Sequence, residues 1–107
     1  QALYIQGFRD YREGNYSRAI DYFNGALSLH PSHALARRYL NQSKTKLDEL
    51  IQLTLLEANR HYEKKQYRQA SAKYKQVMIL IGRKSDPTYK EAWARYRETL
   101  LLVKGAF

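Results

Sequence analysis

Apolar side chains recur along most of this chain at the spacing of an α-helix. In residues 16–29, and again in residues 67–81, they fall at i, i+4 and i+7, which places them on one face of a helix. No segment shows the sustained alternation of apolar and polar positions that predicts a β-strand. The pattern therefore predicts an all-α fold.

Glycine and proline mark where the predicted helices end. A first helix over about 2–13 ends at Gly14, a second ends before Pro31, and the helix over 67–81 ends at Gly82. Glycine suits this place because the residue after a helix commonly takes a positive φ, and proline suits it because proline cannot continue the helix.

Two further residues are typical of helix starts. Asp86 followed by Pro87 predicts a last helix over 87–104, because the aspartate accepts from free N–H groups and the proline has none to lose. Ser32 is expected to cap the third helix in the same way. About five helices are predicted in all.

The third helix is expected to be long. Residues 32–81 contain neither glycine nor proline, so the simplest interpretation is one helix over about 33–65. Its middle, 41–46, is polar on every face, which is typical of a helix that bridges solvent between two packed ends. The alternative is a break near Asp48, which could cap a new helix.

The chain contains an internal repeat with an offset of 51 residues. Small residues let two helices approach closely, and aromatic rings fill the space beside them. The matching small residues are Gly7 and Ala58, Ala19 and Ala70, Ala26 and Val77, and the matching rings are Tyr11 and Tyr62, Tyr16 and Tyr67, Phe23 and Tyr74. Each copy is predicted to be an antiparallel helix pair, with its turn at Gly14–Asn15 or Lys65–Gln66.

The first copy resembles the tetratricopeptide repeat (TPR) family. The residues that carry the resemblance are Gly7, Gly14, Tyr16, Ala19, Phe23, Ala26 and Pro31. The run from Asp86 to Trp93 looks like the end of one repeat and the start of the next, whereas the second copy has Lys65 in place of the turn glycine and a longer exit. The resemblance covers about 2–31 and 54–98, and implies an α-solenoid fragment of antiparallel helix pairs.

We expect one TPR-like module over 1–107. An offset of 51 residues, where the family has 34, leaves 17 extra residues, which is about one helix. The expected parts are repeat one at 2–33, an inserted or extended helix at 34–53, repeat two at 54–86 and a terminal or capping helix at 87–104. Because the first residue is glutamine, we interpret the chain as part of a larger protein.

The charge is strongly basic and uneven. Nineteen lysines and arginines against ten acidic residues give a net charge of +9, all of it in residues 34–107. This asymmetry indicates an acidic peptide, a nucleic acid or a membrane surface as partner, or simply a solvated basic face. The candidate basic patch is Arg60, Lys64, Arg68, Lys73 and Lys75. No nucleic-acid-binding motif accompanies it, so nucleic acid or another polyanion stays the second choice of partner.

No motif of an enzyme or a metal site is present. The chain has no cysteine and no glycine-rich phosphate loop, so no cofactor is expected. His30 and His33 flank a proline and are interpreted as loop histidines, and Asp10 and Glu13 as members of a solvated ion-pair face rather than a catalytic pair. No apolar run approaches the ~20 residues that span a membrane.

We therefore expect a protein–protein interaction or scaffolding module. The resemblance implies that a peptide or a helix of a partner binds on the face of the first helix of each pair. The candidate partner-binding residues are Tyr4, Phe8, Tyr11, Leu55, Asn59 and Tyr62. The alternative is that the aromatic stripe at 4, 8 and 11 belongs to the core.

A homodimer is also expected. One helix over 33–65 would be about 48 Å long, and its apolar residues would have too little of their own chain to cover them. Those residues are Leu47, Leu50, Ile51 and Leu53. A twofold contact through 47–56 and the helix of Trp93 would cover them.

Overall fold

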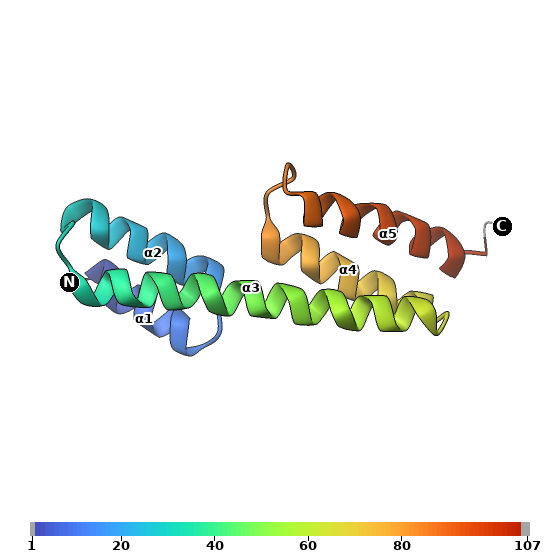
Figure 1. Cartoon of the computed structure of the whole chain (residues 1–107), viewed down its shortest axis with the longest axis horizontal. Coiled ribbons are helices and arrows are strands. Elements are labelled where there is room, and N and C mark those ends of the chain that lie inside the picture. Colours follow the sequence, from blue (N-terminus) through green and yellow to red (C-terminus); the bar gives the residue numbers. More distant parts are fainter. Residues whose placement is uncertain (1, 106–107) are drawn as a thin grey trace. The chain divides into compact units, whose positions relative to one another are not determined.

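The computed structural model describes residues 2–105, and those residues form five helices and no strand (Figure 1). The helices are α1 (Ala2–Arg12), α2 (Tyr16–Leu29), α3 (Ala34–Glu63), α4 (Tyr67–Ile81) and α5 (Pro87–Val103). The predicted all-α fold is confirmed, and the bounds of α2 and α4 are those predicted. Within the described part of the chain, no helix combines the length and apolarity needed to cross a membrane.

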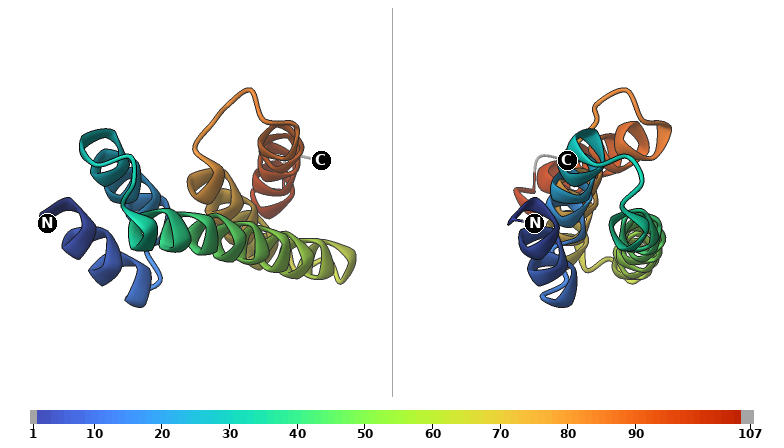
Figure 2. Two further views of the ribbon diagram at one scale, coloured as in Figure 1. Left: turned by 60° about the vertical axis from the view of Figure 1, so that its left-hand side comes forward. Right: turned by 90° about the vertical axis from the view of Figure 1, so that its left-hand side faces the viewer.

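The chain divides into two compact units, with the boundary between Glu49 and Leu50. Unit one contains α1, α2 and the first half of α3, and unit two contains the second half of α3, α4 and α5. In unit one α1 lies beside α2, and in unit two α4 lies beside α5 (Figure 2). Because α3 runs through residue 48 without interruption, the alternative break near Asp48 does not occur.

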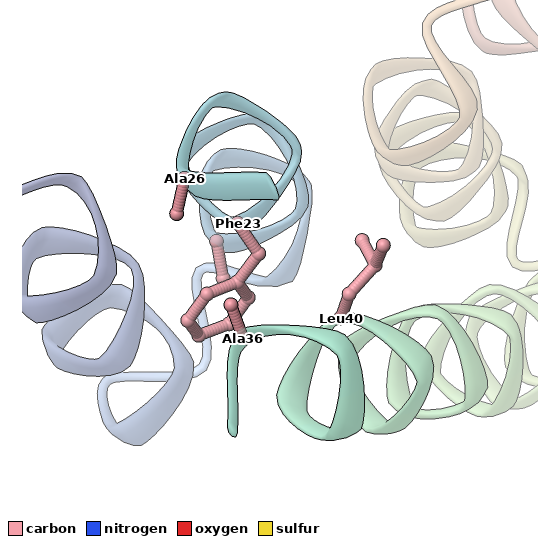
Figure 3. Close-up of a cluster of buried hydrophobic side chains, with 5 residues drawn as sticks. Phe23, Ala26, Ala36 and Leu40 are labelled. Atoms are coloured by element: carbon pink, nitrogen blue, oxygen red, sulfur yellow. The ribbon is translucent and has the colours of Figure 1, made fainter. Parts of the chain in front are cut away.

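The core of unit one is built around one phenylalanine. The ring of Phe23 is fully buried and projects from α2 toward Ala36 at the start of α3 (Figure 3). Gly7 of α1 lies on the same ring, because a Cβ atom added at Gly7 would come within 2.8 Å of two ring carbons. The helix pair therefore packs through a residue without a side chain, as its repeat position predicts.

Unit two repeats this core with different residues. Ala58, Ala70 and Val77 are fully buried, and so is Tyr74, which stands where unit one has Phe23. The hydroxyl of Tyr74 donates to the side-chain oxygen of Asn59 at 2.5 Å, so the one polar atom of this ring is satisfied. The small residues that the 51-residue offset pairs are thus buried in both units, together with one aromatic ring in each.

The two turns have the same backbone geometry. Asn15 and Gln66, which precede α2 and α4, have φ of −87° in both cases and ψ of 68° and 70°. The residue before each has a positive φ, 83° at Gly14 and 60° at Lys65. This left-handed conformation costs a lysine about 1–2 kcal/mol, so the absent glycine weakens the second turn without changing its shape.

A third helical segment completes each unit, with an offset of 56 residues that the sequence comparison missed. Ala36 in α3 and Ala92 in α5 are both fully buried. Ser43 and Thr99 are buried too, and each hydroxyl donates to the carbonyl oxygen four residues earlier, at 2.7 and 2.9 Å. The expectation that 41–46 only bridges solvent is therefore wrong for Ser43, because this internal hydrogen bond lets its hydroxyl be buried.

The helix caps agree with the sequence at α5 but not at α3. The Asp86 carboxylate accepts from the backbone N–H groups of Thr88 and Tyr89. The predicted cap at Ser32 is wrong: α3 begins at residue 34, and the N–H of Ala36 donates to the Nδ1 atom of His33 at 3.1 Å. An imidazole nitrogen can replace the hydroxyl because it is also an acceptor.

The close contact at Gly7 can be tested by adding one methyl group. Gly7→Ala should lower the free energy of unfolding by about 1–3 kcal/mol, because the new Cβ overlaps the Phe23 ring. In the matched control Gly25→Ala, the nearest atom is the mobile Cδ1 of Leu3 at 3.1 Å, so the change should stay within about 1 kcal/mol. Urea unfolding measures both, and a Gly7→Ala variant as stable as the parent would contradict the packing.

Candidate functional site

The three predicted binding residues of α1 lie in an aromatic cluster with α3. The ring of Tyr4 lies 4.8 Å from that of His33, and the ring of Phe8 lies 5.1 Å from that of Tyr39. The hydroxyl of Tyr11 donates to the side chain of Gln42 at 2.9 Å. All three predicted residues are half-buried, so this face of α1 is largely covered by α3, as the core interpretation of the stripe predicts.

The three predicted residues of the second copy also contact their own unit. Leu55 packs against the core, and Asn59 accepts the hydroxyl hydrogen bond of Tyr74. Tyr62 donates to the carboxylate of Glu98, and the guanidinium of Arg95 lies 4.3 Å from its ring centre. The hydrogen bond to Glu98, together with partial burial, raises the pKa of Tyr62. These contacts hold α3 to α4 and α5.

A strip of α1 next to the aromatic cluster is exposed to solvent. Ile5 is 54% exposed, and a surface groove of about 410 Å³ beside it is lined by Ile5, Phe8, Arg9, Arg12 and Glu13. Of the predicted residues, Phe8 alone lines this groove, and the guanidinium of Arg12 lies 5.9 Å from its ring centre. The groove therefore combines apolar walls with two cations and one carboxylate.

One part of this combination, an exposed aliphatic residue followed by an arginine, also occurs in unit two. Leu56, which the 51-residue offset matches to Ile5, is 48% exposed, and the offset also matches Arg60 to Arg9. In each copy the arginine follows the aliphatic residue by four positions, so both side chains lie on one face of the helix. Sequence inspection missed Ile5 and Leu56, although the repeat offset that pairs them was the signal that could have found them.

The predicted basic patch extends over α3, the turn that follows it and α4. Arg68 and Lys75 of α4 are exposed and seven residues apart, and therefore share a helical face. Lys73 points elsewhere and forms an ion pair of 3.6 Å with Glu57. Arg60 is exposed on α3, and Lys64 is exposed in the turn that follows α3. The patch is thus distributed over α3, this turn and α4, and one of its members, Lys73, is paired with Glu57.

The polar residues of the first turn have a structural role. Asp10 is buried and accepts from Arg18 and from Asn15, both at 3.3 Å, so its placement in a solvated face is wrong. These two partners satisfy the buried carboxylate, and the backbone N–H of Asn15 also donates to the carbonyl oxygen of Asp10. Within residues 2–105, no three potential ligands of the histidine, cysteine or carboxylate type come together to hold a metal ion.

Comparison with family models, with curated proteins and with solved structures finds no match to this chain.

The buried hydroxyl of Tyr74 gives the fold a dependence on alkaline pH. Burial raises the pKa of Tyr74 above its usual value of about 10, so the folded state favours the neutral phenol. The stability that the buried Tyr74 contributes is fully present below about pH 10, where the tyrosine of the unfolded chain is also neutral. This stability is lost as the pH rises through the pKa of Tyr74 in the folded state. Urea unfolding should show the parent losing more stability than Tyr74→Phe between about pH 8 and pH 11. Equal losses would contradict this role.

Proposed function

We propose that this chain is a protein-interaction module of the TPR-like type. Each unit binds a segment of a partner protein through its own outward strip, which lies on α1 in unit one and on the second half of α3 in unit two. The observation that supports this proposal most is the repeated pair of an exposed aliphatic residue and an arginine, Ile5 with Arg9 and Leu56 with Arg60.

The chemistry of these strips defines the partner segment. Covering an exposed isoleucine or leucine removes apolar surface from water, which is worth about 25 cal/mol per Å². An arginine one turn away can hold a carboxylate through two parallel hydrogen bonds. The matching segment therefore carries an apolar side chain and an acidic side chain close together.

Selection from a random peptide library on the intact chain tests this proposal. The selected peptides should combine an apolar and an acidic residue, and a variant with both Ile5→Asp and Leu56→Asp should weaken their binding about tenfold or more. Both replaced side chains are exposed, so this variant should remain folded. Lys75→Glu, on another helical face, is the control and should bind within about twofold of the parent. Peptides that tolerate the double aspartate variant would contradict the proposal.

A second candidate function, homodimerisation, is favoured by an apolar groove between α3 and α4. Its volume is about 260 Å³, and its lining residues are Leu50, Thr54, Gln76, Ile79 and Leu80. Ile79 is 68% exposed and Leu53, from the same part of α3, is 55% exposed. A second copy could cover this surface by a twofold contact, which is the commonest symmetry of soluble oligomers.

Sedimentation at micromolar concentration tests the dimer. The parent should sediment as a dimer, and Leu53→Glu with Ile79→Glu should give a folded monomer, because two charges would be buried without partners at the interface. Leu56→Glu is the matched control and should leave the dimer intact. A monomeric parent would remove this candidate function while leaving the peptide-binding proposal standing.

A further inference from the structure

The outward face of α5 carries a stripe of exposed basic and apolar side chains, which we call the α5 stripe. Its members are Lys90, Trp93, Arg97, Leu101 and Lys104, spaced at i, i+3, i+7, i+11 and i+14. This spacing keeps them on one helical face, opposite the buried Ala92 and Thr99. Trp93 is 45% and Leu101 44% exposed.

A pocket lies at the beginning of the α5 stripe. Its volume is about 340 Å³, and its walls are the rings of Tyr89 and Trp93 and the side chains of Lys84 and Lys90. The guanidinium of Arg97 lies 4.7 Å from the Trp93 ring centre, a distance at which a cation is attracted to an indole. Trp93 is also the most exposed aromatic side chain within residues 2–105. An apolar surface of this kind, held beside cations, suits a ligand that is both apolar and acidic.

Unit two carries an excess of positive charge. From residue 50 onward the chain has twelve lysines and arginines against five acidic residues. Three of these acids are engaged within the unit, because Asp86 caps α5, Glu57 pairs with Lys73, and Glu98 accepts from Tyr62 and pairs with Arg95. None of the five lies on the α5 stripe.

We propose that the α5 stripe binds an acidic amphipathic α-helix of a partner protein. The three cations recur every seven residues, about 10.5 Å apart along the helix axis, and a partner helix with an acidic residue at every seventh position has the same spacing. Apolar side chains between those acids can contact Leu101 and enter the pocket at Trp93. The α5 stripe of a second copy does not fit, because it would bring cations against cations.

The α5 stripe shares no residue with the strips of α1 and α3, so the proposal does not rest on the proposed function. A nucleic acid or an anionic membrane would also be attracted by the three cations, but neither requires charges at a seven-residue spacing. The spacing is therefore the feature that distinguishes a helix from these other anionic partners.

The only tryptophan of the chain, Trp93, belongs to the α5 stripe and lines its pocket, so its fluorescence reports binding directly. The probe is a synthetic helical peptide of about three heptads, with glutamate at every seventh position and leucines between. Titrated into the intact chain at physiological salt, it should change the Trp93 emission saturably. A peptide of the same composition, with its glutamates distributed around the helix, should bind about tenfold more weakly or worse.

Charge reversal locates the site. Lys90→Glu and Arg97→Glu should each weaken binding of the first peptide about tenfold or more, whereas Lys75→Glu, the same charge change elsewhere in unit two, should stay within about twofold. Leu56→Asp, which disrupts the strip of the proposed function, should leave the Trp93 response unchanged. Circular dichroism of each variant checks that it is folded.

Four results would overturn the proposal. They are no change in emission, equal binding of the two peptides, an equal loss on Lys75→Glu, and tighter binding of a single-stranded oligonucleotide or of anionic vesicles than of the peptide. The last result would assign the stripe to a nucleic acid or a membrane surface.

Discussion

The contact on which both units depend is the packing of one aromatic ring against a helix that has almost no side chain at that point. In unit one the Phe23 ring lies on Gly7, and in unit two the Tyr74 ring stands in the same place beside Ala58. Complete burial of such a ring contributes about 1.5–3 kcal/mol. In unit one, the contact between this ring and Gly7 also sets how closely α1 and α2 approach, because any larger residue at position 7 would separate these helices.

This constraint explains why helix α3 can serve both units. Each unit needs a small residue on its third helical segment, and α3 supplies Ala36 to unit one while α5 supplies Ala92 to unit two. Unit two also needs a small residue on its first segment, and α3 supplies Ala58 as well. With no glycine or proline between these positions, one helix meets both requirements.

Most of the fold could be predicted from the sequence, because local signals decide helix ends and spacing decides the buried faces. The helix cap at His33 could not be predicted, because the His33 ring packs against Tyr4, which lies 29 residues earlier in the sequence. The burial of Asp10 could not be predicted either, because its ion-pair partner Arg18 lies on α2, after the turn between α1 and α2. Signals of this kind depend on tertiary packing, which a pattern along the chain does not contain.

The candidate site was harder to predict for a related reason. Aromatic residues are favoured both in cores and in binding surfaces. Their pattern along the chain therefore does not distinguish a core residue from a binding residue. In α1, the rings of Tyr4, Phe8 and Tyr11 mainly pack against α3. The surface available to a partner consists of the residues that the core leaves exposed. The exposed Ile5 and Leu56 lie beside the covered faces, and Trp93 lies on α5, the last helix of unit two. The exposed surface of these helices therefore consists of residues that the core does not need.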